Sequence, residues 1–261
     1  MHKVIVINLD RSRDRLDEFV AHNGAAVDIE RFAAIEGKLL DQAALERAGI
    51  IRPDHLLVDG ALGNTMSHLT LWQRAIDEKQ ALTICEDDAI LNRNFADLSG
   101  KLLDFCREHF DIVFWGWNFD APVIYDLYPG GGKCTAFFNQ AEIPGLTDGF
   151  KAATLFPSLQ RVYEVYGTFC YTISPKGARR LMEICLPIGD GKVPSQALGY
   201  GVDIVGADIA MNAAYRDIFA LACVPPIAIC RNDVTASTVG DSVRVRRQAH
   251  AQKKVSSYLI D

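Results

Sequence analysis

Three adjacent acids, Glu86, Asp87 and Asp88, follow a short apolar run over residues 81–85. A run of this length, rich in Leu, Ile and Thr, predicts a buried strand, and open α/β sheets bind ligands at the carboxyl ends of their strands. Because side chains alternate along a strand, we expect Glu86 and Asp88 on one face and Asp87 on the other. Two converging carboxylates favour a hard divalent cation whose shell a diphosphate completes. The alternative is a solvated acidic turn.

A second group of charged residues follows the first apolar run of the chain. Residues 4–9 predict a central strand, and the segment from Asp10 to Arg15 opens a helix that we expect to end near His22. Since Arg binds phosphate through two hydrogen bonds, this loop could present charges to a nucleotide. An ordinary charged first helical turn explains the same residues equally well.

A helix is expected to begin at Gly63, with Asn64 or Thr65 as its cap. Free backbone N–H groups at such a helix start favour an anion, so Gly63, Ser67 and His68 are candidate donor-site residues. A single His in this position is more often a structural residue than a catalyst. The face of this helix that we expect in the core carries Leu62, Met66, Leu69, Trp72 and Ile76.

The elements that must position these residues alternate between strand and helix from residue 3 to residue 117, which predicts a mostly parallel sheet in one α/β domain. Residues 120–161 are rich in Pro and Gly, and we expect an irregular insertion there that serves as an acceptor region or a lid. Residues 166–173 predict another strand. The expected domain covers residues 1–240, and a basic tail covers residues 241–261.

One further acid, Asp208, stands at the start of a later predicted helix. It can serve either as the N-cap of that helix or as a carboxylate that faces a cleft. As a bare sequence feature, the cap is the better interpretation.

Composition excludes several classes of protein. The chain has 261 residues, 49% of them hydrophobic, which is ample for a sizeable core. Its net charge of −6 argues against a general nucleic-acid binder. The seven cysteines form no close pairs of the kind that zinc or redox motifs require, which is typical of a reducing compartment. No apolar run approaches the ~18–20 residues of a membrane span, so we expect a soluble, cytoplasmic protein.

Five ordered pieces of the sequence together resemble glycosyltransferase family 25, which includes lipooligosaccharide galactosyltransferases and procollagen-modifying relatives. The resemblance runs from residue 3 to about residue 240. It implies a GT-A type, Rossmann-like fold, a nucleotide-sugar donor that is most often UDP-galactose, and a bound Mn²⁺ or Mg²⁺. The pieces are residues 6–12 with Arg15, residues 34–37, Gly63 with Ser67, His68 and Trp72, residues 86–88, and residues 171–174 with Gly177 and Ala178.

The resemblance also implies roles for individual residues. Asp88 is the expected principal metal ligand, together with Glu86. Glu86 and Asp87 are expected to be shared between the metal ion and the hydroxyl groups of the ribose and the sugar. Asp208 is the expected general base for the acceptor hydroxyl, and Asp203 is its nearby rival. The residues expected to border the nucleotide on the first strand are Asn8, Leu9 and Arg15.

The implied reaction moves a hexose, with inversion, from the nucleotide sugar to a hydroxyl of a glycan such as lipopolysaccharide, lipooligosaccharide or another cell-surface polysaccharide. If the acceptor is lipid-linked, the basic tail could rest on the inner face of the membrane. Two other readings stay open: a catalytically silent GT-A domain used for binding or scaffolding, and another metal-dependent nucleotide-sugar enzyme.

Overall fold

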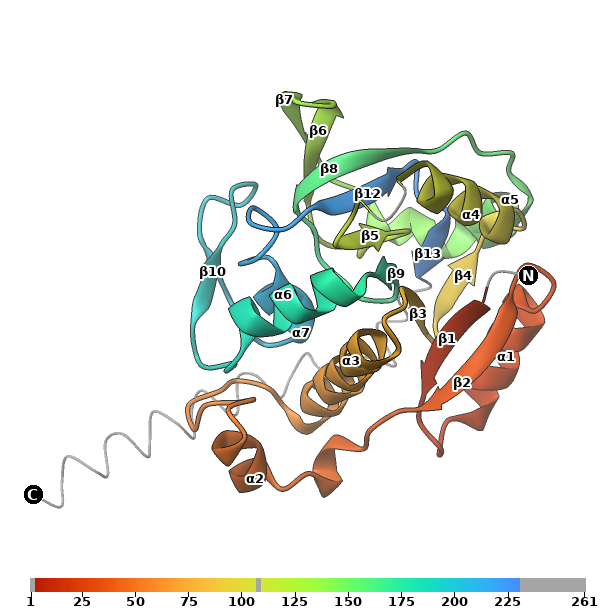
Figure 1. Ribbon diagram of the computed structural model, residues 1–261. Helices are drawn as coiled ribbons and strands as arrows, with labels where there is room; N and C mark the ends of the chain where they lie inside the picture. Colours follow the sequence, from red (N-terminus) through yellow and green to blue (C-terminus); the bar gives the residue numbers. More distant parts are fainter. Residues whose placement is uncertain (1–2, 107–108, 231–261) are drawn as a thin grey trace, which may run out of the picture.

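The protein is an α/β fold built on one large sheet (Figure 1), seen in a computed structural model that describes residues 3–106 and 109–230. Within these residues nine strands form the sheet in the order β2-β1-β3-β9-β5-β12-β8-β6-β7. Strands β2, β1, β3, β5, β12 and β6 run in one direction, and β9, β8 and β7 run in the other. The mostly parallel central sheet expected from the sequence is therefore confirmed. The strand bounds are β1 Lys3–Asn8, β2 Asp28–Ala33, β3 Leu82–Glu86, β5 Ile112–Phe114, β6 Val123–Tyr128, β7 Gly131–Ala136, β8 Ser158–Glu164, β9 Cys170–Ile173 and β12 Ala220–Val224.

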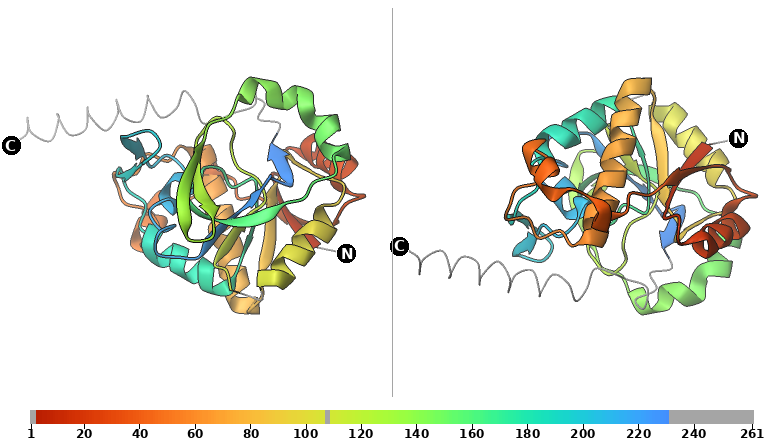
Figure 2. Two further views of the ribbon diagram at one scale, coloured as in Figure 1. Left: turned by 90° about the horizontal axis from the view of Figure 1, so that it is seen from above. Right: turned by 90° about the horizontal axis from the view of Figure 1, so that it is seen from below.

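Helices cover both faces of this sheet (Figures 1 and 2) because its central strands are apolar on both sides. In β1, Val6 packs in a core cluster with Phe19, whereas the neighbouring Ile5 packs in another cluster with Trp72 and Leu181. The alternation of side chains along one strand thus serves two helical layers. The helices of the first layer are α1 (Arg13–Asn23) and α4 (Phe95–Cys106), and those of the second are α3 (Asp59–Glu78), α6 (Pro175–Cys185) and α7 (Ala207–Met211).

The long helix α3 begins at Asp59, earlier than the sequence analysis expected. Gly63 therefore lies in the second turn and offers no free N–H groups to an anion, which corrects the expected helix start. The glycine is needed for packing instead, because a Cβ atom there would lie 2.4 Å from the carbonyl oxygen of Ile35. A Cβ atom on Gly37 would lie even closer, 1.7 Å from the carbonyl oxygen of Asp59, so the segment after β2 crosses the start of α3 at backbone contact.

The segment 120–161, expected to be irregular, contains regular structure. Strands β6 and β7 form a hairpin that projects beyond the rest of the sheet (Figure 1), and β8 joins it to β12. Pro129 and Gly130 connect the two hairpin strands, and Gly130 has a φ angle of 76°. The residues that suggested a loop are thus the ones that a tight turn requires. Between the hairpin and β8 lie η2 (Gln140–Leu146) and α5 (Thr147–Ala152).

Shorter elements complete the fold. The strand expected over residues 166–173 begins only at Cys170, so residues 165–169 form a loop before β9. Ser174 caps α6 by accepting a hydrogen bond from the backbone N–H of Gly177, and Pro175 occupies the first turn. The remaining elements are η1 (Gly37–Leu39), α2 (Gln42–Arg47), β4 (Ala89–Leu91), β10 (Lys192–Pro194), β11 (Gly201–Asp203) and β13 (Ala228–Cys230).

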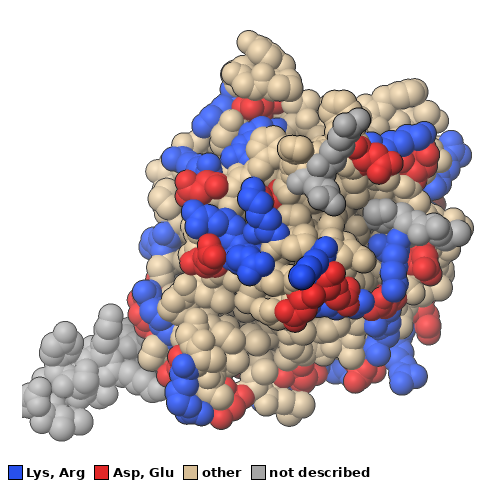
Figure 3. Space-filling view, in the orientation of Figure 1, with Lys and Arg blue, Asp and Glu red and all other residues tan. Residues whose placement is uncertain are grey.

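The surface in Figure 3 carries acidic and basic side chains interspersed with each other. None of the seven cysteines, all of which the structure describes, forms a disulfide bond. Among the residues that the structure describes, no helix has the length and apolar character that crossing a membrane needs. The expected basic tail over residues 241–261 and the domain boundary at residue 240 lie outside the described residues, so both stay predictions.

Candidate active site

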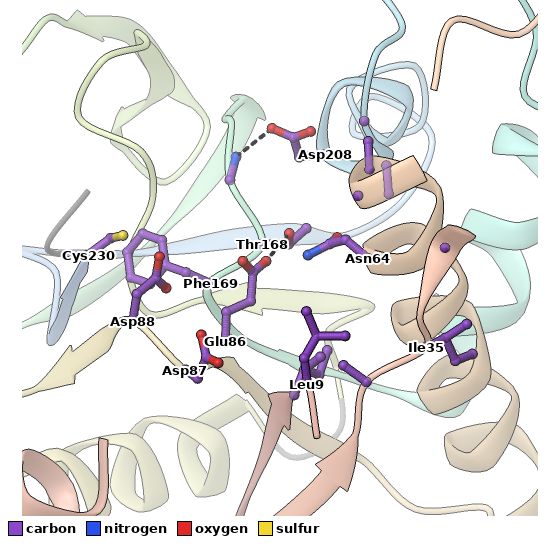
Figure 4. Close-up of a pocket in the computed structure, with 18 of the residues that line it drawn as sticks. Leu9, Ile35, Asn64, Glu86, Asp87, Asp88, Thr168, Phe169, Asp208 and Cys230 are labelled. Carbon is purple, nitrogen blue, oxygen red and sulfur yellow. Dashed lines mark hydrogen bonds between the residues drawn. The ribbon is translucent and has the colours of Figure 1, made fainter. Parts of the chain in front are cut away.

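A pocket of about 590 Å³ opens at the carboxyl ends of β1 and β3, which is where open α/β sheets bind ligands (Figure 4). Two groups of residues line it. The triplet wall consists of Arg15, Glu86, Asp87 and Asp88, and the far wall consists of Asn118, Asp120, Gly167 and Asp208. The volume is in the range of small-molecule sites.

The backbone around the three acids differs from the continuous strand that the sequence predicts. Strand β3 ends at Glu86, and Asp87 and Asp88 form a turn that leads into β4. Side-chain alternation therefore stops at Glu86, and all three acids line the pocket. The expectation that Asp87 points away from the other two acids is wrong, because the chain is no longer extended where Asp87 stands.

Glu86 is held by donors from α3 and from the loop before β9. Its Oε1 accepts hydrogen bonds from Thr168 Oγ1 at 2.6 Å and from His68 Nε2 at 3.3 Å. Burial raises the pKa of Glu86, but the hydrogen bond and electrostatic attraction of His68, followed by the hydrogen bonds from Thr168 and Asn64, outweigh it and bring the pKa below its ordinary value. Glu86 is thus an ionised carboxylate with one oxygen fixed by the protein.

Asp87 joins the triplet to the first strand and to α1. Its Oδ2 accepts a hydrogen bond of 2.7 Å from Asn8 Nδ2, and its Oδ1 forms an ion pair with Arg15. Burial raises the pKa of Asp87, although Asn8 and Arg15 oppose that effect. Asn8 is itself buried and does not line the pocket, so it positions Asp87, while Leu9 and Arg15 do line it.

Asp88 is the least satisfied member of the triplet. Its Oδ1 is buried and has no hydrogen-bond partner among the described residues, and Arg15 lies 3.7 Å from its Oδ2. Burial, followed by the negative charge of Glu86, raises the pKa of Asp88 to about 6. A buried carboxylate oxygen without a donor is costly unless a ligand satisfies it.

Asp208 faces the same pocket from the far wall. Its Oδ2 accepts a hydrogen bond of 3.1 Å from the backbone N–H of Gly167, and the next residue, Thr168, is the donor to Glu86. Figure 4 shows Asp208 well separated from the triplet. Burial raises the pKa of Asp208, and the charges of Glu86 and Asp120 raise it further. The N-cap of α7 is Gly206, so the interpretation of Asp208 as a cap is wrong.

Besides Asn8, five residues named from the sequence do not line the pocket. Asp10 is exposed and forms an ion pair with Arg31. Asp203 is paired with Lys192 in the β10–β11 ribbon, so its role as a rival base stays a prediction that the pocket does not support. Gly63, Ser67 and His68 are buried in α3, where Ser67 accepts a hydrogen bond from the backbone N–H of Ile35 and His68 contacts Glu86. The sequence predicts that this helix begins at Gly63, but α3 begins at Asp59. Gly63, Ser67 and His68 therefore lie inside the helix and not at its amino end.

Other pocket residues escaped the sequence analysis. Thr168 and Gly167 lie in the loop before β9, a segment whose sequence predicts a strand, and the sequence indicates no role for Asn64 other than a helix cap. Gly167 has a φ angle of 95°, and a Cβ atom there would lie 2.4 Å from Asn118 Oδ1. A glycine inside an apparent strand is the signal that could have revealed this loop.

A divalent cation fits the triplet wall. The unpartnered Oδ1 of Asp88 and the ionised Glu86 are hard oxygen donors of the kind that Mn²⁺ and Mg²⁺ prefer. The described residues contain no group of three or more His, Cys, Asp or Glu side chains arranged to hold a metal by themselves. That is compatible with an ion that takes one or two carboxylates from the protein and the rest of its shell from substrate phosphates and water.

Comparison with known proteins shows a match to one protein family. The sequence profile of glycosyltransferase family 25, described as an LPS biosynthesis protein, matches residues 1–196, which include the whole triplet wall. Among curated proteins, none matches the chain. One similar solved structure is the "Crystal Structure of A197 from STIV", which is 13% identical with a TM-score of 0.39 over 85% of this chain and 81% of that one.

Proposed function

The chain belongs to glycosyltransferase family 25, and from this premise we propose that it moves a hexose, galactose from UDP-galactose being the expected one, to a hydroxyl of a lipopolysaccharide-type glycan. A glycosyltransferase needs one group that stabilises the leaving diphosphate and another that takes the proton of the attacking hydroxyl. The observation that carries the proposal is that Asp88 and Asp208, 120 residues apart in the sequence, line one pocket from its two walls.

The triplet wall is the proposed donor side. Asp88 would hold Mn²⁺ or Mg²⁺ there, because its Oδ1 has no partner among the described residues. The bound ion would supply a Lewis acid that neutralises the charge developing on the leaving diphosphate. Arg15 lines the same wall and adds a positive charge. Glu86 keeps one oxygen toward the pocket, where it accepts a hydrogen bond from a hydroxyl of the donor.

The far wall is the proposed acceptor side, with Asp208 as the general base. Its raised pKa, which burial causes, suits a carboxylate that must take up a proton. Asn118 and Asp120 lie on the same wall, so the acceptor glycan would enter beside them.

The proposed step is an inverting displacement. The acceptor oxygen forms a bond to the anomeric carbon while the bond from that carbon to the diphosphate oxygen breaks. The electron pair of the broken bond leaves with UDP, and the hydroxyl proton passes to Asp208. Positive charge develops on the sugar ring in such a transition state, so the anionic residues of both walls favour it.

A screen of nucleotide sugars tests this proposal. Thermal shift with UDP-galactose, UDP-glucose, UDP-N-acetylglucosamine and GDP-mannose, each with and without Mn²⁺, should show stabilisation by a UDP-sugar that depends on the metal. Slow release of UDP from the stabilising sugar should accompany it. Stabilisation without any UDP release, also with lipopolysaccharide added, would support the silent binding domain instead. No stabilisation by any nucleotide sugar would contradict the proposal.

A further inference from the structure

A row of buried groups runs from the core of the protein to Glu86. Trp72 Nε1 donates to Tyr171 Oη at 2.8 Å, Tyr171 Oη lies 2.8 Å from His68 Nδ1, and His68 Nε2 lies 3.3 Å from Glu86 Oε1. Trp72, Tyr171 and His68 are at most 1% exposed, and none of them lines the pocket. Trp72 and His68 stand four residues apart on one face of α3, and Tyr171 is on β9.

The direction of these hydrogen bonds follows from the chemistry of the groups. The indole N–H of Trp72 can only donate, so the Tyr171 oxygen accepts it. The Tyr171 hydroxyl then has one hydrogen of its own, and among the described residues the only acceptor within reach is His68 Nδ1. A His68 ring with its hydrogen on Nδ1 would leave the Tyr171 hydrogen without an acceptor in a buried place.

The same reasoning shows whether the other ring nitrogen of His68, Nε2, carries a hydrogen. If Nδ1 accepts from Tyr171, a neutral His68 carries its hydrogen on Nε2, and Nε2 is the atom that faces the Glu86 carboxylate. A doubly protonated ring would again place a hydrogen on Nδ1 against the Tyr171 hydroxyl. One arrangement alone satisfies all four groups, and it ends in a donor aimed at Glu86 Oε1.

We propose that Trp72 and Tyr171 fix His68 as its neutral Nε2–H tautomer, and that His68 is a positioning residue which turns the second oxygen of Glu86 toward a hydroxyl of the sugar donor. Thr168 donates to the same Oε1 atom from the loop before β9, so this oxygen is occupied by two donors, of which His68 lies behind the pocket. Oε1 cannot rotate away without losing both hydrogen bonds, so Oε2 is the oxygen left for the pocket, where Asn64 also hydrogen-bonds the Glu86 carboxylate. The role in donor binding rests on the proposed function, whereas the tautomer does not.

Nitrogen NMR of the His-labelled protein tests the tautomer, with His68→Gln to assign the signal. We expect the pattern of a neutral imidazole protonated on Nε2. In Tyr171→Phe, which removes the donor to Nδ1, the two tautomers should both be populated. A wild-type ring protonated on Nδ1, or on both nitrogens, would overturn the proposal.

Two matched variants test the role in positioning. A Gln side chain can place its amide nitrogen where His68 Nε2 stands, whereas an Asn amide reaches only the place of Nδ1. We expect His68→Gln to keep the KM for the donor close to wild type, and His68→Asn to raise it about 10- to 100-fold, as the loss of a group that orients a ligand does. A merely structural His would lower the melting temperature in both variants and leave the KM of both alike.

Equal KM values in the two variants, each measured at a temperature where both are folded, would overturn the positioning role. If the wild-type protein turns over no nucleotide sugar, the proposed function fails, and the NMR result still decides the tautomer.

Discussion

The two walls of the pocket are built in different ways. On the triplet wall the acids are consecutive, and side-chain donors from other elements hold two of them: Glu86 has Thr168 and His68, and Asp87 has Asn8. On the far wall Asp208 has only backbone N–H groups, from Gly167 and from Ile209. Donors bring the pKa of Glu86 below its ordinary value, so this carboxylate is charged and can bind, whereas the buried Asp208 has a raised pKa and is suited to take a proton. Asp88 also has a raised pKa, but it lies beside Arg15, and its Oδ1, which has no hydrogen-bond partner among the described residues, is free to bind a cation. The contrast predicts that the triplet wall governs donor affinity and that the far wall governs turnover.

Removing the charge of Asp208 should have the largest effect, because it removes the proposed base of the far wall. In Asp208→Asn we expect kcat to fall about 10²- to 10⁴-fold while the affinity for the donor stays near wild type, because the lost group acts on the proton of the acceptor. Steady-state kinetics at saturating donor and acceptor measures it. Asp203→Asn is the matched control, since Asp203 is paired with Lys192 away from the pocket. A wild-type kcat in Asp208→Asn would disprove the assignment of the base.

The loop that joins the walls offers a second test. Gly167→Ala should destabilise the fold by about 1–3 kcal/mol, because Gly167 has a positive φ angle and an added Cβ would collide with Asn118. It should also lower kcat, since the backbone N–H of Gly167 holds Asp208. Urea unfolding and kinetics measure the two effects.

Gly199→Ala is the control for that variant. Gly199 also has a positive φ angle, but a Cβ there would meet nothing within 4 Å. We expect it to lose stability through its backbone conformation alone and to keep its turnover. Equal kcat values in the two variants would show that the loop does not couple to Asp208.

The smallest effect is expected at Glu30, an acid that lines neither wall. Lys3 and Arg74 pair with it, and hydrogen bonds, from Arg74 first, lower the pKa of Glu30 from 4.5 to about 2. A lowered pKa means that the ionised form stabilises the folded state above pH 4.5, and that this stabilisation disappears as the pH falls toward 2. Glu30→Gln should therefore cost about 1 kcal/mol of unfolding free energy at pH 7.

Urea unfolding at several pH values checks the prediction for Glu30. The difference between Glu30→Gln and wild type should shrink as the pH is lowered below 4.5, and turnover at pH 7 should not change. Glu78→Gln, which removes a more exposed partner of the same Arg74, should cost less. A difference that is constant from pH 7 to pH 2.5 would contradict the ion-pair explanation.

The sequence predicted the parts of the molecule that are local in the chain. Apolar runs located β1, β3 and the helices that alternate with them, and consecutive acids located the triplet wall. The hairpin of β6 and β7 was missed because Pro129 and Gly130, which make its turn, also mark loops. The donors of Glu86 could not be found, because Thr168 is 82 residues away from it and only the pairing of β3 with β9 brings the two together.

The position of α3 shows how one error at an element boundary spreads to the site. The apolar face of the helix was predicted correctly, but its first residue is Asp59 and not Gly63. As a result His68 was expected at a helix end facing the donor, while the structure places it inside, behind Glu86. Periodicity fixes which face of a helix is buried far better than where the helix begins.

The proposed function requires that Asp88 holds a cation which in turn binds the diphosphate of the donor. Isothermal titration calorimetry of UDP with wild type and Asp88→Asn, each with and without Mn²⁺, measures whether it does. We predict that Mn²⁺ increases the affinity of the wild-type protein for UDP at least about tenfold and that Asp88→Asn abolishes this gain. A gain of the same size in Asp88→Asn, or no gain in the wild-type protein, would contradict the claim.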